Sequence, residues 1–347
     1  MSKKIKICLI SIILVVIGVI LFWQLGERSI VIENFESKET KEASEANNEN
    51  QINPITGLRC ENYNRRPIAV MLAEDPITRP LSGISFADLI IEMPVITGSI
   101  TRMMAVFGCE SPAEIGSVRS ARHDFIPLAM GLDAIYAHWG GSHFALDKLN
   151  AGIIDNIDAL KNPYNAFWRK SDKPAPHNGF TSIARLVNAA QKLGCRLVNK
   201  FEGYPHLKNP KPAINSKAKL TVGYSGHYKV YYIYNPKTNS FKRWRDGMPE
   251  IDKINQKQVE VQNVVIMWAA SRQIEGPYYN DVDVEGMGGA LVYRNGEEIE
   301  GTWEKKGFYK ATKLYFFDKE GKEIEFVPGK IWIEIVEPYQ EVKWELL

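Results

Sequence analysis

The stretch from Gly116 to Ser142 gathers residue types that could do chemistry. It reads GSVRSARHDFIPLAMGLDAIYAHWGGS, and its polar and glycine residues include Arg119, Ser120, Arg122, His123, Asp124, His138, Gly140, Gly141 and Ser142. Apolar segments separate these groups, a pattern typical of functional groups displayed at the ends of buried elements. The sequence therefore locates a candidate site, but it does not name a reaction.

Five arginines lie at or beside the expected strand ends of the first half of the chain: Arg79, Arg102, Arg119, Arg122 and Arg169. A guanidinium group binds carboxylates and phosphates through paired hydrogen bonds, and a nearby helix N-terminus adds further donors. The pattern therefore indicates a pocket for an anionic group. The alternative is a set of structural ion pairs with carboxylates of the same region, namely Asp88, Glu92, Asp124 and Asp133.

Two histidines are candidates for proton transfer or for orienting a substrate. His138 ends an apolar run just before the paired glycines Gly140 and Gly141, and His177 lies in the segment PAPHN, where prolines restrain the backbone. A restrained loop histidine suits general acid–base work, and paired glycines permit close approach of a ligand. The alternative is a loop histidine satisfied by internal hydrogen bonds beside a tight turn.

Other catalytic patterns are weaker. Ser120 or Ser142 could join a histidine and an aspartate in a triad, but the chain has no G-x-S-x-G elbow. Asp88 and Glu92 could serve glycosidic chemistry, although four residues along a strand need not converge. No recognised ligand spacing connects the histidines, so we expect neither a metal site nor a cofactor.

Composition sets few limits. The 347 residues carry a formal net charge of +2, which gives no reason to expect a nucleic-acid partner. Beyond Cys8, the widely spaced Cys60, Cys109 and Cys195 show no disulfide framework. One disulfide with one free thiol is an alternative, but we expect three thiols.

The N-terminus predicts a membrane anchor. Lysines at positions 3, 4 and 6 precede the apolar run Ile7–Trp23, which as a helix would span roughly 25 Å. The lysines place the preceding end in the cytoplasm, and no small-x-small cleavage site follows the run. We therefore expect cytoplasmic residues 1–6, a single-pass signal-anchor over 7–24, a disordered tether over 25–52, and a body outside the cell.

The fold class expected for the body is α+β, in two domains. Residues 53–206 mix strand and helix signals and predict a mixed α/β domain, with strands over Pro67–Leu72, Ala87–Glu92, Thr101–Phe107 and Ala134–His138, and helices over Ala121–Met130, Phe144–Asn150 and Ser182–Leu193. Residues 207–347 predict a mostly antiparallel β domain, with strands that include Val259–Met267, Ile324–Val327 and Ile331–Val336.

Several of these segments resemble the DUF3048, or YerB-like, family of Gram-positive envelope proteins. The resemblance rests on RPLSGISFADLIIE (79–92, with Arg79, Ser82, Asp88 and Glu92), ITRMMAVF (100–107, with Arg102), IGSVRSAR (115–122), DAIYAHWGGS (133–142), FWR (167–169), APHN (175–178, ending at Asn178), GTW (301–303) and PGKIWI (328–333). The motifs cover essentially everything after the tether. The resemblance implies a two-part α+β body that is usually exported as a lipoprotein. It supplies no reaction, and this chain has no lipobox cysteine.

These expectations combine into one hypothesis. The protein is a membrane-tethered envelope protein whose first domain binds an anionic ligand related to the cell wall, with His138 and His177 orienting it or transferring protons. The ligand would be held by Arg79, Ser82, Asp88, Glu92, Arg102, Arg119, Ser120, Arg122, Gly140, Gly141, Ser142, Arg169 and Asn178. The alternative is a non-catalytic scaffold whose β domain docks another envelope protein. A hydrolase acting on envelope glycan or peptide ranks third.

Overall fold

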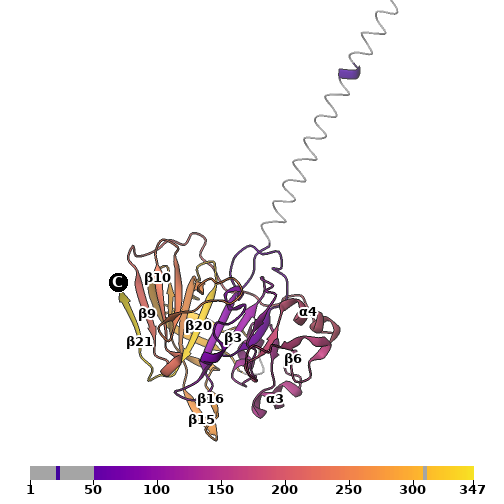
Figure 1. The fold of residues 1–347 in the computed structure, drawn as a ribbon. Coiled ribbons are helices and arrows are strands. Elements are labelled where there is room, and N and C mark those ends of the chain that lie inside the picture. Colours follow the sequence, from indigo (N-terminus) through magenta and orange to yellow (C-terminus); the bar gives the residue numbers. More distant parts are fainter. Residues whose placement is uncertain (1–20, 24–50, 308–310) are drawn as a thin grey trace, which may run out of the picture. The chain divides into compact units, whose positions relative to one another are not determined.

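The computed structural model describes residues 21–23, 51–307 and 311–347 (Figure 1). Residues 52–347 form one compact unit. The expected anchor over 7–24 lies outside the described residues except for 21–23, which are helical, and most of the expected tether lies outside them as well. No helix of the described part is long and apolar enough to cross a membrane. The anchor therefore stays a prediction.

A ten-stranded sheet forms the centre of the body. Its order is β19 (Tyr315–Asp318), β18 (Glu297–Lys305), β17 (Gly286–Arg294), β14 (Asn263–Trp268), β20 (Ile331–Val336), β2 (Leu89–Pro94), β3 (Thr101–Phe107), β1 (Ile68–Leu72), β5 (Ile135–His138) and β6 (Asn156–Asp158). The first five strands in this order come from the second half of the chain and the last five from the first half. Parallel pairing of β20 with β2 joins them, so one sheet crosses the boundary expected at 206/207.

A second sheet covers part of one face of the large sheet. Its order is β12 (Met248–Pro249), β11 (Ser240–Arg245), β10 (Val230–Asn235), β9 (Ala218–Val222) and β21 (Val342–Leu346), with β13 (Glu260–Val261) paired to β11. Alternate residues of β9 and β10 point inward, where Leu220 and Tyr232 join Trp332 of the large sheet in one apolar cluster. Leu186 of α4 (Ile183–Lys192) belongs to the same cluster.

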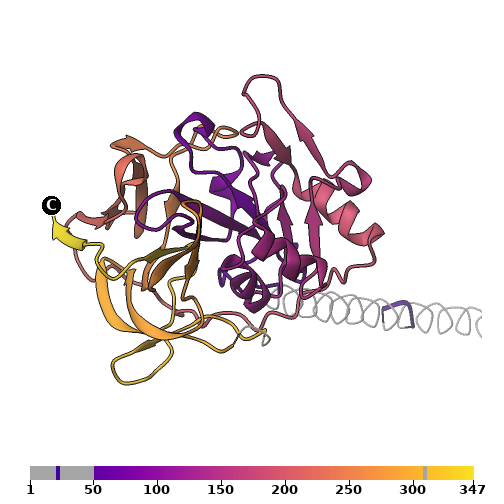
Figure 2. The ribbon, with the colours of Figure 1, turned by 90° about the horizontal axis from the view of Figure 1, so that it is seen from below.

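Helices α2 (Phe125–Gly131) and α3 (His143–Asn150) belong to the opposite face. Phe125, Ile126 and Leu149 share a second apolar cluster with Leu89 and Ile333 of the large sheet. Because both faces are covered, the central strands are buried along their whole length, as in sheets packed between two layers. Figure 2 shows β1 to β3 (indigo to purple) between the helical segments (magenta) and the C-terminal strands (orange to yellow).

Two small sheets and four short 3-10 helices complete the fold of the described residues. The hairpin of β15 (Ser271–Glu275) and β16 (Tyr279–Val282) follows β14 and projects at the lower end of Figure 1. The three-stranded sheet has the order β4 (Ile115–Gly116), β8 (Gly179–Thr181) and β7 (Phe167–Arg169). The 3-10 helices are η1 (Pro76–Thr78), η2 (Ile84–Phe86), η3 (Pro163–Asn165) and η4 (Gly226–Tyr228).

The described body is mostly β with few helices, which confirms the α+β class only coarsely. The strands expected over Thr101–Phe107 and Ile331–Val336 match β3 and β20 residue for residue. The helix expected from Ala121 begins only at Phe125, because the segment before it forms backbone contacts with the Gly140 loop. The strand expected over Ile324–Val327 is wrong, since that segment makes only isolated bridges.

The cysteine expectation is also corrected. Cys60 and Cys109 form a disulfide, while Cys195 is free. The two paired residues are far apart in the sequence, and their Cα atoms lie 5.8 Å apart in the fold, within the range that a disulfide needs. Sequence spacing could not show this proximity, because the contact depends on the turn after β3.

Candidate functional site

The polar groups of the first half meet at one edge of the large sheet. Strands β1 and β5 run parallel, and β3 runs antiparallel to β1, with Leu72 opposite Met103. The carboxyl ends of β1 and β5 therefore lie beside the amino end of β3. Glu74 and Asp75 follow β1 at this edge, and Arg102 lies near the start of β3. We call this region the polar edge.

Three of the predicted arginines come together there, and we call Arg102, Arg119 and Arg122 the arginine cluster. Arg102 is only 6% exposed, and its Nη1 donates to the Ser120 carbonyl at 2.9 Å. Burial, and after it the positive charges of Arg122 and Arg119, lower the pKa of Arg102 to about 9. Mutual repulsion of this kind requires guanidinium groups that lie close together.

The arginine cluster has little compensating negative charge. Arg119 Nη2 lies 3.4 Å from Asp75 Oδ2, and among the described residues this is the cluster's one ion pair. Arg122 Nη1 donates to the Tyr278 carbonyl at 3.0 Å, and its guanidinium lies 5.3 Å from the centre of the Tyr279 ring. The Nε atoms of Arg119 and Arg122 are buried without a hydrogen-bond partner in the described part. A surplus of buried guanidinium donors suits an anionic ligand.

His177 joins the arginine cluster through the same carboxylate. Its Nδ1 lies 3.7 Å from Asp75 Oδ2, and its side chain is partly exposed. Burial lowers the pKa of His177, and the positive charge of Arg119 lowers it further. At neutral pH the ring is therefore mostly neutral and can accept or donate a hydrogen bond.

His138 differs from His177 because it is fully buried. Its Nδ1 lies 2.8 Å from the Gly140 carbonyl, and its Nε2 lies 3.3 Å from Asn156 Oδ1. Burial lowers its pKa. Both ring nitrogens have internal partners, so the arrangement corresponds to the alternative weighed from the sequence, a satisfied histidine beside a turn.

The paired glycines and Ser142 shape the backbone beside His138. Gly140 has a φ of +62° and donates its N–H to Asp158 Oδ1 at 2.8 Å. Gly141 forms a bridge with Ala121, and Ser142 is the N-cap of α3, with its Oγ accepting from the Ala145 N–H at 3.2 Å. These residues thus hold the segment that carries Arg119 and Arg122 against the end of β5.

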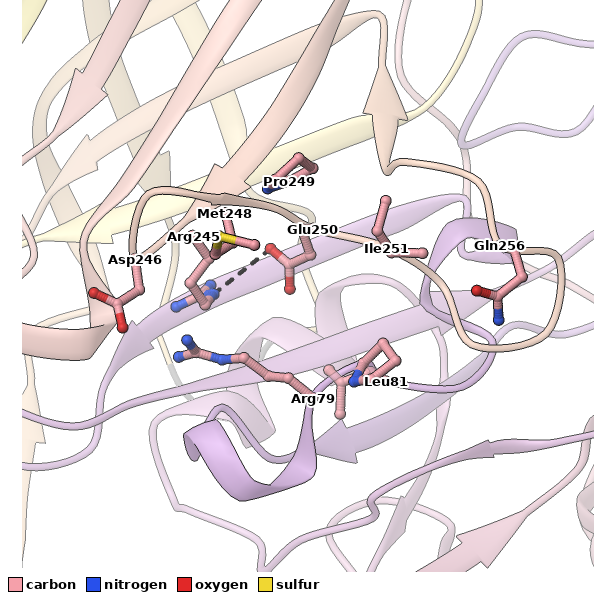
Figure 3. Close-up of a pocket in the computed structure, with 10 residues that line it drawn as sticks. Arg79, Leu81, Arg245, Asp246, Met248, Pro249, Glu250, Ile251 and Gln256 are labelled. Carbon is pink, nitrogen blue, oxygen red and sulfur yellow. Dashed lines mark ion pairs between the residues drawn. The ribbon is translucent and has the colours of Figure 1, made fainter.

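Arg79 lies apart from the arginine cluster and lines a cavity. This cavity of about 420 Å³ is lined by Arg79, Pro80, Leu81, Arg245, Asp246, Met248, Pro249, Glu250, Ile251 and Gln256 (Figure 3). Arg79 Nη2 donates to the carbonyls of Glu74, at 3.0 Å, and His227, at 2.9 Å. Burial lowers the pKa of Arg79, and the neighbouring charge of Arg245 adds to that effect.

Glu92 belongs to a buried charge network between the two sheets. The network consists of Glu74, Glu92, Arg243, Arg245, Glu250 and Glu334. Glu92 and Glu334 are directly opposite each other in the parallel β2–β20 ladder, and Arg243 Nη2 lies 2.5 Å from Glu92 Oε2 and 3.2 Å from Glu334 Oε1. Thr101 Oγ1 donates to the other oxygen of Glu92 at 2.6 Å. The Glu92 carboxylate is therefore fully engaged within the protein.

The network perturbs its carboxylates in opposite directions. Burial opposes ionisation of Glu92, but the charges of Arg245 and Arg243 outweigh it, so the pKa lies below the usual value. Burial and the negative charge of Glu92 raise the pKa of Glu334 to about 7. Burial also raises the pKa of Glu74 to about 7, although Arg245 opposes it. The network is a structural centre that does not open to a ligand at Glu92 or Glu334.

The remaining predicted residues have local partners. Asp88 Oδ2 accepts backbone N–H groups of Gly108 at 2.5 Å and Cys109 at 2.9 Å, and Ser82 Oγ donates to Glu114 Oε1 at 2.7 Å. Arg169 Nη1 donates to Asn178 Oδ1 at 2.5 Å. The Arg169 guanidinium also lies 4.2 Å from the centre of the Trp139 ring.

The structure also bears on the alternative weighed from the sequence, in which the five arginines form structural ion pairs with nearby carboxylates. None of the four carboxylates proposed as partners forms an ion pair with the five predicted arginines among the described residues. Asp133 pairs with Arg66 and Arg196 instead. Sequence reasoning missed Asp75 as the counter-charge, and it missed Arg243 and Arg245. The available signal was the alternation of Phe241, Arg243 and Arg245 on the inward face of β11.

The described body is mostly β, with two large sheets and two small ones, and three arginines gather at its polar edge. Family models described as the N-terminal and C-terminal domains of a protein of unknown function, DUF3048, match residues 55–196 and 220–333. The chain belongs to this YerB-like DUF3048 family, which confirms the resemblance.

Comparisons with individual proteins agree. The chain is 36% identical over 291 residues to "Putative lipoprotein YerB" of Bacillus subtilis (strain 168), a match that covers 82% of this chain and 85% of that protein. The crystal structure of YerB protein from Bacillus subtilis is similar, with a TM-score of 0.76 and 32% identity over 85% of this chain and 99% of the other.

Proposed function

We propose that this protein is an envelope-associated, extracytoplasmic protein that binds an anionic ligand at the arginine cluster. The observation that carries the proposal is the clustering of Arg102, Arg119 and Arg122 with Asp75 as the paired carboxylate. The side chains of Arg119 and Arg122 are partly exposed and carry buried Nε donors without a partner among the described residues, which favours phosphate or carboxylate groups. His177, partly exposed beside Asp75, orients the ligand or exchanges a proton with it.

Two observations support the extracytoplasmic location. The Cys60–Cys109 disulfide is a bond that persists in oxidising compartments. The similar Bacillus subtilis protein carries a lipoprotein name. The apolar segment 7–24 preceded by lysines is the proposed membrane attachment, with residues 1–6 in the cytoplasm and the body outside.

The ligand class proposed is a phosphorylated or carboxylated component of the cell wall. A short glycerol-phosphate oligomer represents the phosphodiester class, and a muropeptide represents the carboxylate class. Binding should weaken as salt is added, because exposed charges are screened over about 8 Å at physiological ionic strength.

A thermal-shift titration of the full chain with pyrophosphate and these two probes tests the proposal. We expect a saturable rise in melting temperature that Arg119→Ala abolishes. Arg185→Ala is the matched control, because Arg185 is an exposed arginine whose guanidinium lies over Trp168, 4.9 Å from the ring centre. Arg119→Lys retains the charge but loses the paired geometry, and we expect weaker binding by that variant.

The scaffold alternative predicts a different pattern. In that case no probe shifts the melting temperature of the wild-type chain, and Arg119→Ala and His177→Ala lower it by several degrees. Such a result would overturn the anion site and would lead to a search for a protein partner in membrane extracts.

A further inference from the structure

A second cavity lies beside the arginine cluster, between the start of α2 and the β15–β16 hairpin. It has a volume of about 240 Å³ and is lined by His123, Asp124, Pro127, Lys148, Arg272, Asp281, Val282, Asp283, Val284 and Glu285. Three of these side chains offer ligand atoms that lie within 4.8 Å of one another, namely His123, Asp124 and Asp281. The sequence analysis expected no metal site because no recognised ligand spacing connects the histidines, and it did not consider Asp281, which is far from His123 and Asp124 along the chain.

The distances match neighbouring ligands of one ion. His123 Nε2 lies 3.1 Å from Asp124 Oδ1 and 3.1 Å from Asp281 Oδ1. Two ligand atoms at about 2.1 Å from a metal and at right angles are about 3.0 Å apart, and a tetrahedral pair is about 3.4 Å apart. The nitrogen and the two oxygens therefore need only small shifts to hold one cation.

The electrostatics of the cluster also favour a cation. Asp124 is only 5% exposed; burial raises its pKa well above the usual value, and the negative charge of Asp281 raises it further. Burial lowers the pKa of His123, so the ring does not supply a full positive charge at neutral pH. Glu285 lines the same cavity, and its Oε1 is buried without a hydrogen-bond partner among the described residues.

Arg272 would compete with such an ion for Asp281. Its guanidinium pairs with the second oxygen of Asp281 and lies 3.0 Å from Asp283 Oδ1. The Arg272 side chain is 61% exposed, so it can move away without being pulled from a buried position. The oxygen of Asp281 that faces His123 is the other one, Oδ1.

We propose that His123, Asp124 and Asp281 bind a divalent transition-metal ion, with water molecules in the cavity completing its coordination. One imidazole nitrogen with two carboxylates suits Zn²⁺ or Mn²⁺, whereas Ca²⁺ prefers oxygen ligands alone. The ion would tie the hairpin to the start of α2. None of the three proposed metal ligands belongs to the arginine cluster, so the metal site and the proposed anion site are tested independently.

Calorimetric titration of the EDTA-treated full chain with ZnCl₂ and with MnCl₂ tests the site. We expect one saturable site per chain for at least one of the two ions, together with a rise in melting temperature, and we expect both effects to disappear in His123→Ala and Asp281→Asn. Arg272→Ala should bind the ion more tightly than the wild type, because a competing positive charge is removed.

His143→Ala is the matched control. His143 Nε2 lies 3.1 Å from Glu275 Oε2, so this pair also joins the helical side to the hairpin, but it offers only one carboxylate. Circular dichroism shows whether each variant is folded. If His123→Ala does not fold, the metal titrations of Asp281→Asn and Arg272→Ala still test the site. Absence of saturable binding below about 1 mM, or binding unchanged in Asp281→Asn, would overturn the proposal. The three side chains would then be only a contact that docks the hairpin.

Discussion

Glu74 and Asp75 are consecutive residues whose carboxylates serve two different charge clusters. Glu74 Oε2 lies 2.7 Å from Arg245 Nε in the buried network, whereas Asp75 Oδ2 lies 3.4 Å from Arg119 Nη2 in the arginine cluster. The first contact links β1 to the second sheet, and the second lies at the proposed ligand site. A single turn after β1 therefore couples the packing of the two sheets to the position of the candidate binding residues.

Asp75→Asn should tighten anion binding. The substitution removes the carboxylate that pairs with Arg119 and keeps the side chain's size, so an incoming anion no longer competes with a fixed negative charge. Two unit charges about 4 Å apart interact by about 1 kcal/mol in water and by about 4 kcal/mol at an effective dielectric constant of 20, so the affinity should rise by roughly tenfold or more. Titration with pyrophosphate at low and at physiological salt measures the change.

The control for this prediction is Asp172→Asn. Asp172 is exposed and lies outside the arginine cluster, with its Oδ2 atom 3.3 Å from Lys253 Nζ. Its replacement should leave pyrophosphate binding unchanged. Weaker binding by Asp75→Asn would mean that Asp75 orients the arginines for the ligand and does not compete with it.

Arg243→Ala should strongly destabilise the body. Arg243 is fully buried and compensates Glu92 and Glu334, which stand opposite each other in the β2–β20 ladder. Removal of one partner from a buried ion-pair network costs about 3–5 kcal/mol, because the remaining charges lose their compensation. Urea denaturation measures the free energy of unfolding.

Lys319→Ala provides the comparison for Arg243. Lys319 Nζ lies 2.6 Å from Glu300 Oε2 in an exposed pair, and solvent screening leaves a pair of this kind little net effect on stability. If Arg243→Ala cost no more than Lys319→Ala, the network would not hold the two sheets together.

The sequence predicted the elements of the large sheet better than their arrangement. Long apolar strands such as Thr101–Phe107 and Ile331–Val336 were readable because burial on both faces leaves a continuous apolar run. The pairing of β2 with β20 was not readable, since these strands are more than 200 residues apart and no local signal sets their register. Strand β11 was missed because two of its inward residues are arginines.

The candidate site was predicted in part for a related reason. Arg102 lies near the start of β3, and Arg119 and Arg122 lie in the loop between β4 and α2. The fold brings these three close enough for their charges to act on one another. Glu92 lies inside β2 and His138 ends β5, and the side chains of both turn inward and find internal partners. Orientation at a strand end depends on the neighbouring layer, and a single sequence does not specify that layer.

Glu334→Gln should change how stability depends on pH. The pKa of Glu334 is raised from 4.5 to about 7 in the folded state, mainly by burial and then by Glu92. A raised carboxyl pKa contributes stability that is fully present below the unfolded pKa and is lost as pH rises through the folded pKa. The glutamine variant cannot lose a proton at this position. Its free energy of unfolding, relative to that of the wild type, should therefore rise by about 1–3 kcal/mol between pH 5 and pH 8.

Urea denaturation of both proteins across this range measures that difference, in which the contributions of the histidines cancel. Glu74→Gln provides a second test of the same sign, because the pKa of Glu74 is also raised to about 7 by burial. Parallel stability curves for the wild type and both variants would contradict the predicted ionisation of the network.

Reduction of the Cys60–Cys109 disulfide should destabilise the body without changing its fold. The bond connects residues 49 positions apart and thereby restricts the unfolded chain, an effect of about 2–4 kcal/mol for a loop of this length. The double variant Cys60→Ser/Cys109→Ser should therefore unfold at a lower urea concentration, and dithiothreitol should lower the midpoint of the wild type by the same amount.

Cys195→Ser is the control, because Cys195 is free and its loss should leave the response to dithiothreitol intact. A wild-type midpoint that does not respond to dithiothreitol would mean that the two thiols are unpaired in the purified protein, and one support for an extracytoplasmic location would be lost.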